Sequence, residues 1–224
     1  MDVYFQQDIW ISILSHVQEM NLKDEASLQT GDILLFRGNS WISWLVEWFG
    51  VSRYSHVGMV IKNPSFMNLD LEDGTYILES SWNNTPDVED HQMKMGVQLH
   101  LLDDVLKEFP KGSVFVRHVR CERNPEFYDT LVKLHKEIHN KPYDLNPWDW
   151  LCAKYNMMCP LPSDPAYKTT KRFWCSALVS YLFCELGIIE PNVNWSLVAP
   201  REFTSTEAKW VRFRCPIDKE KLIY

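Results

Sequence analysis

The sequence predicts an α+β fold in which an antiparallel sheet packs against helices. Short apolar or alternating runs are typical of strands, and turns or polar loops bound them. Most of these runs precede the two long helical patterns of the second half, so strands and helices do not alternate as in a parallel sheet. The predicted strands span residues 33–36, 56–62, 75–80, 96–101, 113–119 and 210–215.

Length and composition favour one main domain. The chain has 224 residues, of which 46% are hydrophobic and 13% aromatic, enough for one full core. Charged residues make up 24%, which argues against disorder. The net charge of -7 argues against a general nucleic-acid binder. We expect an N-terminal helix and linker at 1–27 and a catalytic domain at 28–224.

Cysteine usage and the N-terminus indicate a reducing, cytoplasmic location. The six cysteines contain no C-x-x-C pair, which argues against a zinc ribbon, and no metal or cofactor is expected. Met1-Asp2-Val3-Tyr4 is acidic where a signal peptide is basic. No apolar run reaches the length of a membrane span. If the source is a virus, a virion location is also open.

The first half of the chain holds two predicted helices around the first strand. Residues 3–20 have the spacing of an amphipathic helix. After the strand at 33–36, Trp41 to Phe49 forms a second helix that Gly50 ends. Trp41, Trp44 and Trp48 share one of its faces, which fits either core packing or one wall of an apolar substrate groove.

Hairpins and loops follow. The strand at 75–80 is the expected hairpin partner of 56–62, and the long polar loop at 81–94 is a candidate lid. A short helix at 102–109 follows the strand at 96–101. Four histidines at alternating or helical polar positions are expected to be solvated: His100, His118, His135 and His139.

Two helices are predicted in the second half. Asn124-Pro125 supplies a cap and a first-turn proline for a helix whose apolar face includes Phe127 and Leu131. The second runs from Lys171 to Leu186 and is apolar on nearly all sides, which is typical of a central helix.

Cys175 lies at the start of this central helix. The positive end of a helix dipole favours a thiolate and therefore nucleophilic chemistry, although a small buried core cysteine is an equally simple interpretation. His56 and Glu79 lie in two of the predicted strands. A cysteine nucleophile needs a base and an orienting group, and these residues supply both types.

An ordered set of motifs over about residues 28–186 resembles the circularly permuted, NlpC-type papain-like enzymes, and most of all the YaeF/YiiX-type amidase family, with members in bacteria and large DNA viruses. The motifs are Thr30-Gly31-Asp32-Ile33-Leu34-Leu35-Phe36-Arg37, Ser55-His56-Val57-Gly58-Met59-Val60, Tyr76-Ile77-Leu78-Glu79-Ser80, Gly96-Val97, Lys141-Pro142-Tyr143-Asp144 and Trp174-Cys175-Ser176-Ala177-Leu178-Val179.

The resemblance implies a permuted papain-like fold with the nucleophile at the N-terminus of a central helix. It implies Cys175 as nucleophile, His56 as base and Glu79 as orienting acid. The expected reaction is hydrolysis of an amide, in a peptide or an acylated amine, through a thioester acyl-enzyme. The substrate-binding candidates are Tyr143, Trp174, Ser176, Trp44 and Trp48.

Two other functions stay open at this point. The first is a thiol acyltransferase or lipase that acts on lipid acyl chains, which the Trp41, Trp44 and Trp48 face would suit. The second is a non-catalytic binding module on the same fold. The expected partner is a small-molecule, peptide or lipid-derived acyl substrate, with peripheral lipid contact open and no nucleic acid. The sequence predicts no oligomeric state.

Overall fold

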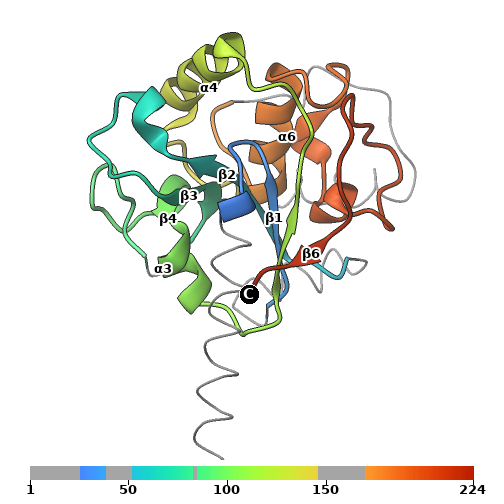
Figure 1. Ribbon diagram of the computed structural model, residues 1–224, viewed down its shortest axis with the longest axis horizontal. Helices are drawn as coiled ribbons and strands as arrows, with labels where there is room; N and C mark the ends of the chain where they lie inside the picture. Colours follow the sequence, from blue (N-terminus) through green and yellow to red (C-terminus); the bar gives the residue numbers. More distant parts are fainter. Residues whose placement is uncertain (1–25, 39–51, 83–84, 146–169) are drawn as a thin grey trace, which may run out of the picture.

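A single antiparallel sheet forms the centre of the molecule (Figure 1). The computed structural model describes residues 26–38, 52–82, 85–145 and 170–224. Within them six strands lie in the order β4-β3-β2-β1-β5-β6. Their bounds are Ile33–Phe36 for β1, His56–Lys62 for β2, Thr75–Ser81 for β3, Gly96–Leu101 for β4, Val114–Arg117 for β5 and Lys221–Leu222 for β6. The predicted α+β class is confirmed.

One side of the sheet is built by β2, β3 and β4, which pair in chain order and leave β4 at the edge. Met59 pairs with Leu78 across β2 and β3, and Glu79 pairs with Gln98 across β3 and β4. The loop from β2 to β3 contains only a short 3-10 turn, Pro64–Met67. The predicted hairpin of the strands at 56–62 and 75–80 is therefore confirmed.

The two faces of the sheet carry different helices, because successive side chains of a strand point to opposite faces. Ile33 and Leu35 of β1 join the larger apolar cluster with the helices α4 (Pro125–Ile138) and α6 (Cys175–Glu185). Leu34 and Phe36 join a smaller cluster with α3 (Leu102–Lys107). Each fully buried aliphatic or aromatic side chain stabilises the fold by about 1.5–3 kcal/mol.

The predicted start of α4 is confirmed. The Asn124 side chain accepts a hydrogen bond from the Phe127 N–H at 3.0 Å, and Pro125 occupies the first turn. The cap satisfies a backbone donor that has no partner inside the helix, while proline has no N–H to satisfy there.

The predicted start of the central helix at Lys171 is wrong, since α6 begins at Cys175. The backbone just before Cys175 is extended and forms hydrogen bonds with another segment. The Phe173 N–H donates to the Pro142 carbonyl, and the Phe173 carbonyl accepts from the Asp144 N–H, both at 3.1 Å. These bonds commit residue 173 to a bridge with the segment 142–144, so the helix starts two residues later.

The predicted strand at 210–215 is also wrong. The carboxylate of Glu202, on the 3-10 turn Pro200–Phe203, accepts from the N–H groups of Lys209, Trp210 and Val211 at 2.8–3.3 Å. The Glu202 side chain thus accepts hydrogen bonds from backbone N–H groups that, in a strand, would donate to the carbonyls of a neighbouring strand. The last strand is β6, which pairs with β5.

Two predicted helices, at 3–20 and 41–49, lie outside the described residues. Another 3-10 turn, Trp195–Leu197, packs beside α6. None of the helices in the described ranges is long and apolar enough to span a bilayer.

Candidate active site

The structure brings Cys175, His56 and Glu79 together. Cys175 is the first residue of α6, His56 is the first residue of β2, and Glu79 lies in β3. The Cys175 side chain lies beside the His56 ring, close enough to help raise the His56 pKa. Nε2 of His56 lies 2.5 Å from Oε2 of Glu79. Because Glu79 occupies Nε2, the nitrogen left for the sulfur is Nδ1.

All three side chains are nearly closed to solvent. Cys175 is 6% exposed, His56 3% and Glu79 1%. A buried carboxylate beside an imidazole is costly unless the two are paired, and their contact supplies that pairing.

The glycine Gly58 allows β2 and β3 to lie close together near the candidate site. A side chain at Gly58 would place its Cβ 2.5 Å from Cδ1 of Ile77 and 3.4 Å from Cβ of Glu79. Both neighbours lie on β3, so a residue with a Cβ would push β3 away from β2. The space at Gly58 thus helps to set the distance between His56 and Glu79.

The second oxygen of Glu79 is also occupied. Oε1 lies 3.0 Å from Nδ1 of His100 and accepts a hydrogen bond from the Ser81 hydroxyl at 3.1 Å. The Gln98 side-chain amide donates to the Ser81 carbonyl at 3.0 Å. Ser81 and His100 therefore hold the carboxylate in one orientation toward His56, and Gln98 in turn holds Ser81.

His100 was expected to be solvated, and this is wrong, because its side chain is fully buried. Sequence reasoning missed its contact with Glu79. The signal was the alternation of the strand at 96–101, in which Gln98 and His100 share a face. The contact of His100 with Glu79 can be inferred from this pattern only when β4 is known to lie beside β3, with Gln98 opposite Glu79.

Two other histidines were also wrongly predicted to be solvated. His135 on α4 is 5% exposed, and its Nε2 lies 2.7 Å from Oε1 of Glu89. His118 is mostly buried, and its Nδ1 lies 2.7 Å from Oδ2 of Asp32. Each imidazole meets a carboxylate that the sequence order does not place beside it.

The charges of the candidate site support one another. Burial disfavours the charged imidazolium of His56, but the Glu79 carboxylate and the contact with Cys175 outweigh it and raise the His56 pKa to about 10. For Glu79, burial would raise the pKa, but His56 and His100 together hold it well below its usual value. His56 and Glu79 are therefore an ion pair at neutral pH.

The start of α6 is fastened to the rest of the site. The Ser80 hydroxyl, one residue after Glu79, donates to the Phe173 carbonyl at 2.7 Å. The Leu178 N–H bonds to the Trp174 carbonyl, so Cys175 lies in the first helical turn. The backbone N–H groups of a first turn have no partner within the helix, and they can donate to a negative oxygen beside the sulfur.

The predicted substrate-binding residues lie in different environments, and two of them are outside the described residues. Tyr143 is partly buried near Cys175, and burial, together with its electrostatic interaction with the Cys175 side chain, raises its pKa well above the usual value. Trp174 directly precedes the cysteine and is 5% exposed. The Ser176 hydroxyl is buried and donates to the Val198 carbonyl at 2.6 Å, and its contact with a substrate stays a prediction. Trp44 and Trp48 lie outside the described residues.

One group of side chains in the described ranges has the atoms for a metal site. Ligand atoms of Asp87, Glu89 and His139 lie within 4.8 Å of one another. The Lys94 ammonium, however, lies 2.5 Å from Oδ2 of Asp87, and His135 contacts Glu89. These ion pairs account for the cluster, which ties the loop after β3 to the end of α4.

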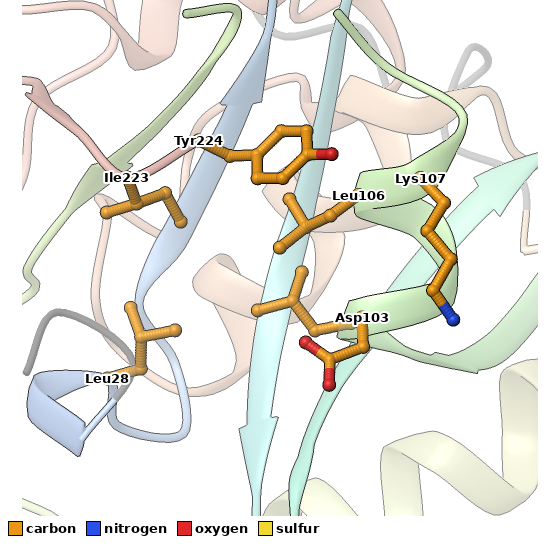
Figure 2. A pocket seen from close by; sticks show the side chains of 7 residues that line it. Leu28, Asp103, Leu106, Lys107, Ile223 and Tyr224 are labelled. Carbon is orange, nitrogen blue, oxygen red and sulfur yellow. The ribbon is translucent and has the colours of Figure 1, made fainter. Parts of the chain in front are cut away.

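A cavity of about 310 Å³ lies away from these residues (Figure 2). Asp103, Leu106 and Lys107 of α3 line one side, and Leu28, Ile223 and Tyr224 face them. This cavity therefore holds none of the predicted site residues.

Comparisons with known proteins add a distant structural similarity. No family model and no curated protein matches the chain. The structure is similar to the crystal structure of metalloprotein YiiX from Escherichia coli O157:H7, with 21% sequence identity and a TM-score of 0.44. The match covers 69% of this chain and 64% of that chain, and thus less than two thirds of YiiX. The candidate site stands on its own geometry.

Proposed function

We propose that the protein is a cysteine hydrolase that cleaves an amide bond, in a peptide or an acylated amine. The observation that carries the proposal is the continuous chain of contacts from Cys175 through His56 to Glu79. Nucleophile, base and orienting group are the three parts that thiol-based acyl transfer requires. With this assignment, the fold is a permuted papain-like one, in which the histidine strand precedes the cysteine helix along the chain.

In the first step, the sulfur of Cys175 attacks the carbonyl carbon of the amide. The sulfur has given its proton to His56, and Glu79 stabilises the resulting imidazolium. Negative charge develops on the carbonyl oxygen, where the first-turn N–H groups of α6 can donate hydrogen bonds. The C–N bond then breaks, His56 gives its proton to the departing amine, and a thioester on Cys175 remains.

In the second step, water replaces the amine. Neutral His56 accepts a proton from the water, which attacks the thioester carbonyl. The carbon–sulfur bond breaks, the carboxylic acid leaves, and the proton on His56 is again shared with the sulfur. Glu79 keeps the ring in one orientation throughout both steps, since its Oε2 is bound to Nε2.

The test is turnover of an acyl-amide library by the wild-type protein and by Cys175→Ala. We expect the substitution to lower turnover by at least about a thousandfold, since it removes the group that forms the covalent bond. Mass spectrometry of the wild-type protein with a slow substrate should show an acyl adduct on the peptide that contains Cys175.

The matched control is Cys184→Ala, which removes a buried cysteine of the same helix. Its turnover should remain within a few-fold of the wild type. Full turnover by Cys175→Ala would refute the proposal. Transfer of the acyl group to an added alcohol, with no free acid formed, would instead indicate an acyltransferase.

A further inference from the structure

His100 is a buried histidine to which the proposed reaction gives no task. It lies on β4, with its side chain fully buried, next to the carboxylate that orients His56. A buried imidazole is costly unless hydrogen bonds or nearby charges compensate for its lost hydration. The groups around the His100 ring therefore influence its protonation state.

Nδ1 of His100 faces a group that accepts protons. It lies 3.0 Å from Oε1 of Glu79, the carboxylate oxygen that does not contact His56. Burial disfavours a charged ring, but Glu79, Asp87 and Thr85 outweigh it, and the His100 pKa is raised. The raised pKa favours the ring that carries two protons.

The charged and polar groups around His100 come from three sides. Glu79 and Ser81 lie on β3, and Gln98 lies two residues before His100 on β4. Asp87, from the loop after β3, also attracts its charge, although the Lys94 ammonium lies 2.5 Å from that carboxylate. Glu79 is therefore the carboxylate that holds His100 directly.

We propose that His100 is a positioning residue of the active site, which is held as an imidazolium against Oε1 of Glu79, fixes the carboxylate for His56, and balances the charge of a thiolate at Cys175. This inference rests on the proposed function of Cys175. It adds a fourth residue, which acts through Glu79 and touches neither the substrate nor the sulfur.

The charge balance explains the role. With both rings protonated, His56, Glu79 and His100 together carry one net positive charge, and a thiolate on Cys175 brings the buried group to zero. Without the charge of His100, the same thiolate would leave a net negative charge in a buried site, which is disfavoured. Loss of this charge should therefore make the thiolate form only at higher pH.

The experiment measures alkylation of Cys175 by iodoacetamide as a function of pH, which requires no substrate. In His100→Asn, the amide nitrogen can replace Nδ1 as donor to Glu79, but the positive charge is lost. We expect the midpoint of the profile to rise by about one pH unit, the order expected for one unit charge in a partly desolvated site. An unchanged midpoint would overturn the inference.

The matched control is His118→Asn. His118 also holds a carboxylate through Nδ1, that of Asp32, but it is not part of the contacts around Cys175. Its midpoint should equal that of the wild type, and an equal shift in both variants would count against a specific role of His100. If wild-type Cys175 is no more reactive than free cysteine at any pH, the proposed function itself fails, which is a different result.

A second measurement needs no variant of the buried histidine. Long-range proton–nitrogen NMR of the wild-type protein reports whether each histidine nitrogen carries a proton. At pH 7.5 we expect both nitrogens of His100 to be protonated. A neutral tautomer of His100 at that pH would overturn the inference even if His100→Asn fails to fold.

Discussion

At the scale of single residues, the candidate site contains ionisable side chains that contact one another and are almost closed to solvent. His56 and Glu79 are each almost fully buried, and their 2.5 Å contact stabilises the charged form of both. Each partner therefore changes the protonation of the other: the carboxylate raises the pKa of His56, and the imidazole lowers that of Glu79. Such mutual shifts make stability depend on pH.

The predicted pH dependence has two limbs. Because the folded pKa of Glu79 is lowered, its contribution is present above its ordinary value of about 4.5 and is lost as the pH falls. Because the folded pKa of His56 is raised to about 10, its contribution is complete below about 6.5 and is lost as the pH rises toward 10. One proton accounts for a slope of at most about 1.4 kcal/mol per pH unit.

Urea unfolding from pH 3 to 10 tests this, with Glu79→Gln as the variant. The substitution removes the charge behind both shifts, so we expect lower stability at pH 7 and a flatter profile on both limbs. The control is Glu207→Gln, which breaks an exposed ion pair with Arg53. Its profile should run parallel to that of the wild type. A profile of Glu79→Gln that is parallel as well would contradict the assigned ion pair.

At the scale of elements, short contacts at the ends of helices decide where the site residues lie. The bonds of Phe173 to the segment 142–144 end the extended chain, and α6 can then begin with Cys175. The Ser80 hydroxyl ties the same carbonyl to β3, beside Glu79. The start of α6 and the strand of the orienting acid are thus held together.

The cap of α4 gives a prediction at this scale. Asn124→Ala removes the acceptor for the Phe127 N–H and should lower the free energy of unfolding by about 1 kcal/mol. Asn124→Asp keeps a side-chain acceptor and is the control, with stability close to the wild type. Chemical denaturation compares the three proteins. Equal stability of Asn124→Ala and the wild type would show that the cap contributes nothing.

At the scale of the whole molecule, most of the strands could be predicted from the sequence, whereas their order in the sheet could not. Apolar runs such as Ile33–Phe36 and His56–Lys62 have few alternative structures, and Asn124-Pro125 marks a helix start directly. The predicted strand at 210–215 failed because periodicity does not register the buried Glu202 carboxylate that captures its backbone.

The candidate site could be predicted in part. Cys175, His56 and Glu79 were found from their residue types, their places in predicted elements and the family resemblance. His100 and Ser81 were missed because their meaning depends on which strand lies beside β3, a fact of sheet order. The hydrogen bond from the Ser176 hydroxyl to the Val198 carbonyl could not be predicted either, since the two residues are distant in sequence.

The most direct test of the central claim is the rate at which iodoacetamide alkylates Cys175 at pH 6, followed by mass spectrometry of its peptide. Free cysteine is almost entirely a thiol at this pH, whereas a sulfur that has given its proton to His56 is a nucleophile. We expect Cys175 to react at least about tenfold faster than free cysteine, and His56→Ala to abolish the difference. A Cys175 that reacts no faster than free cysteine, or whose rate is unchanged in His56→Ala, would contradict the account.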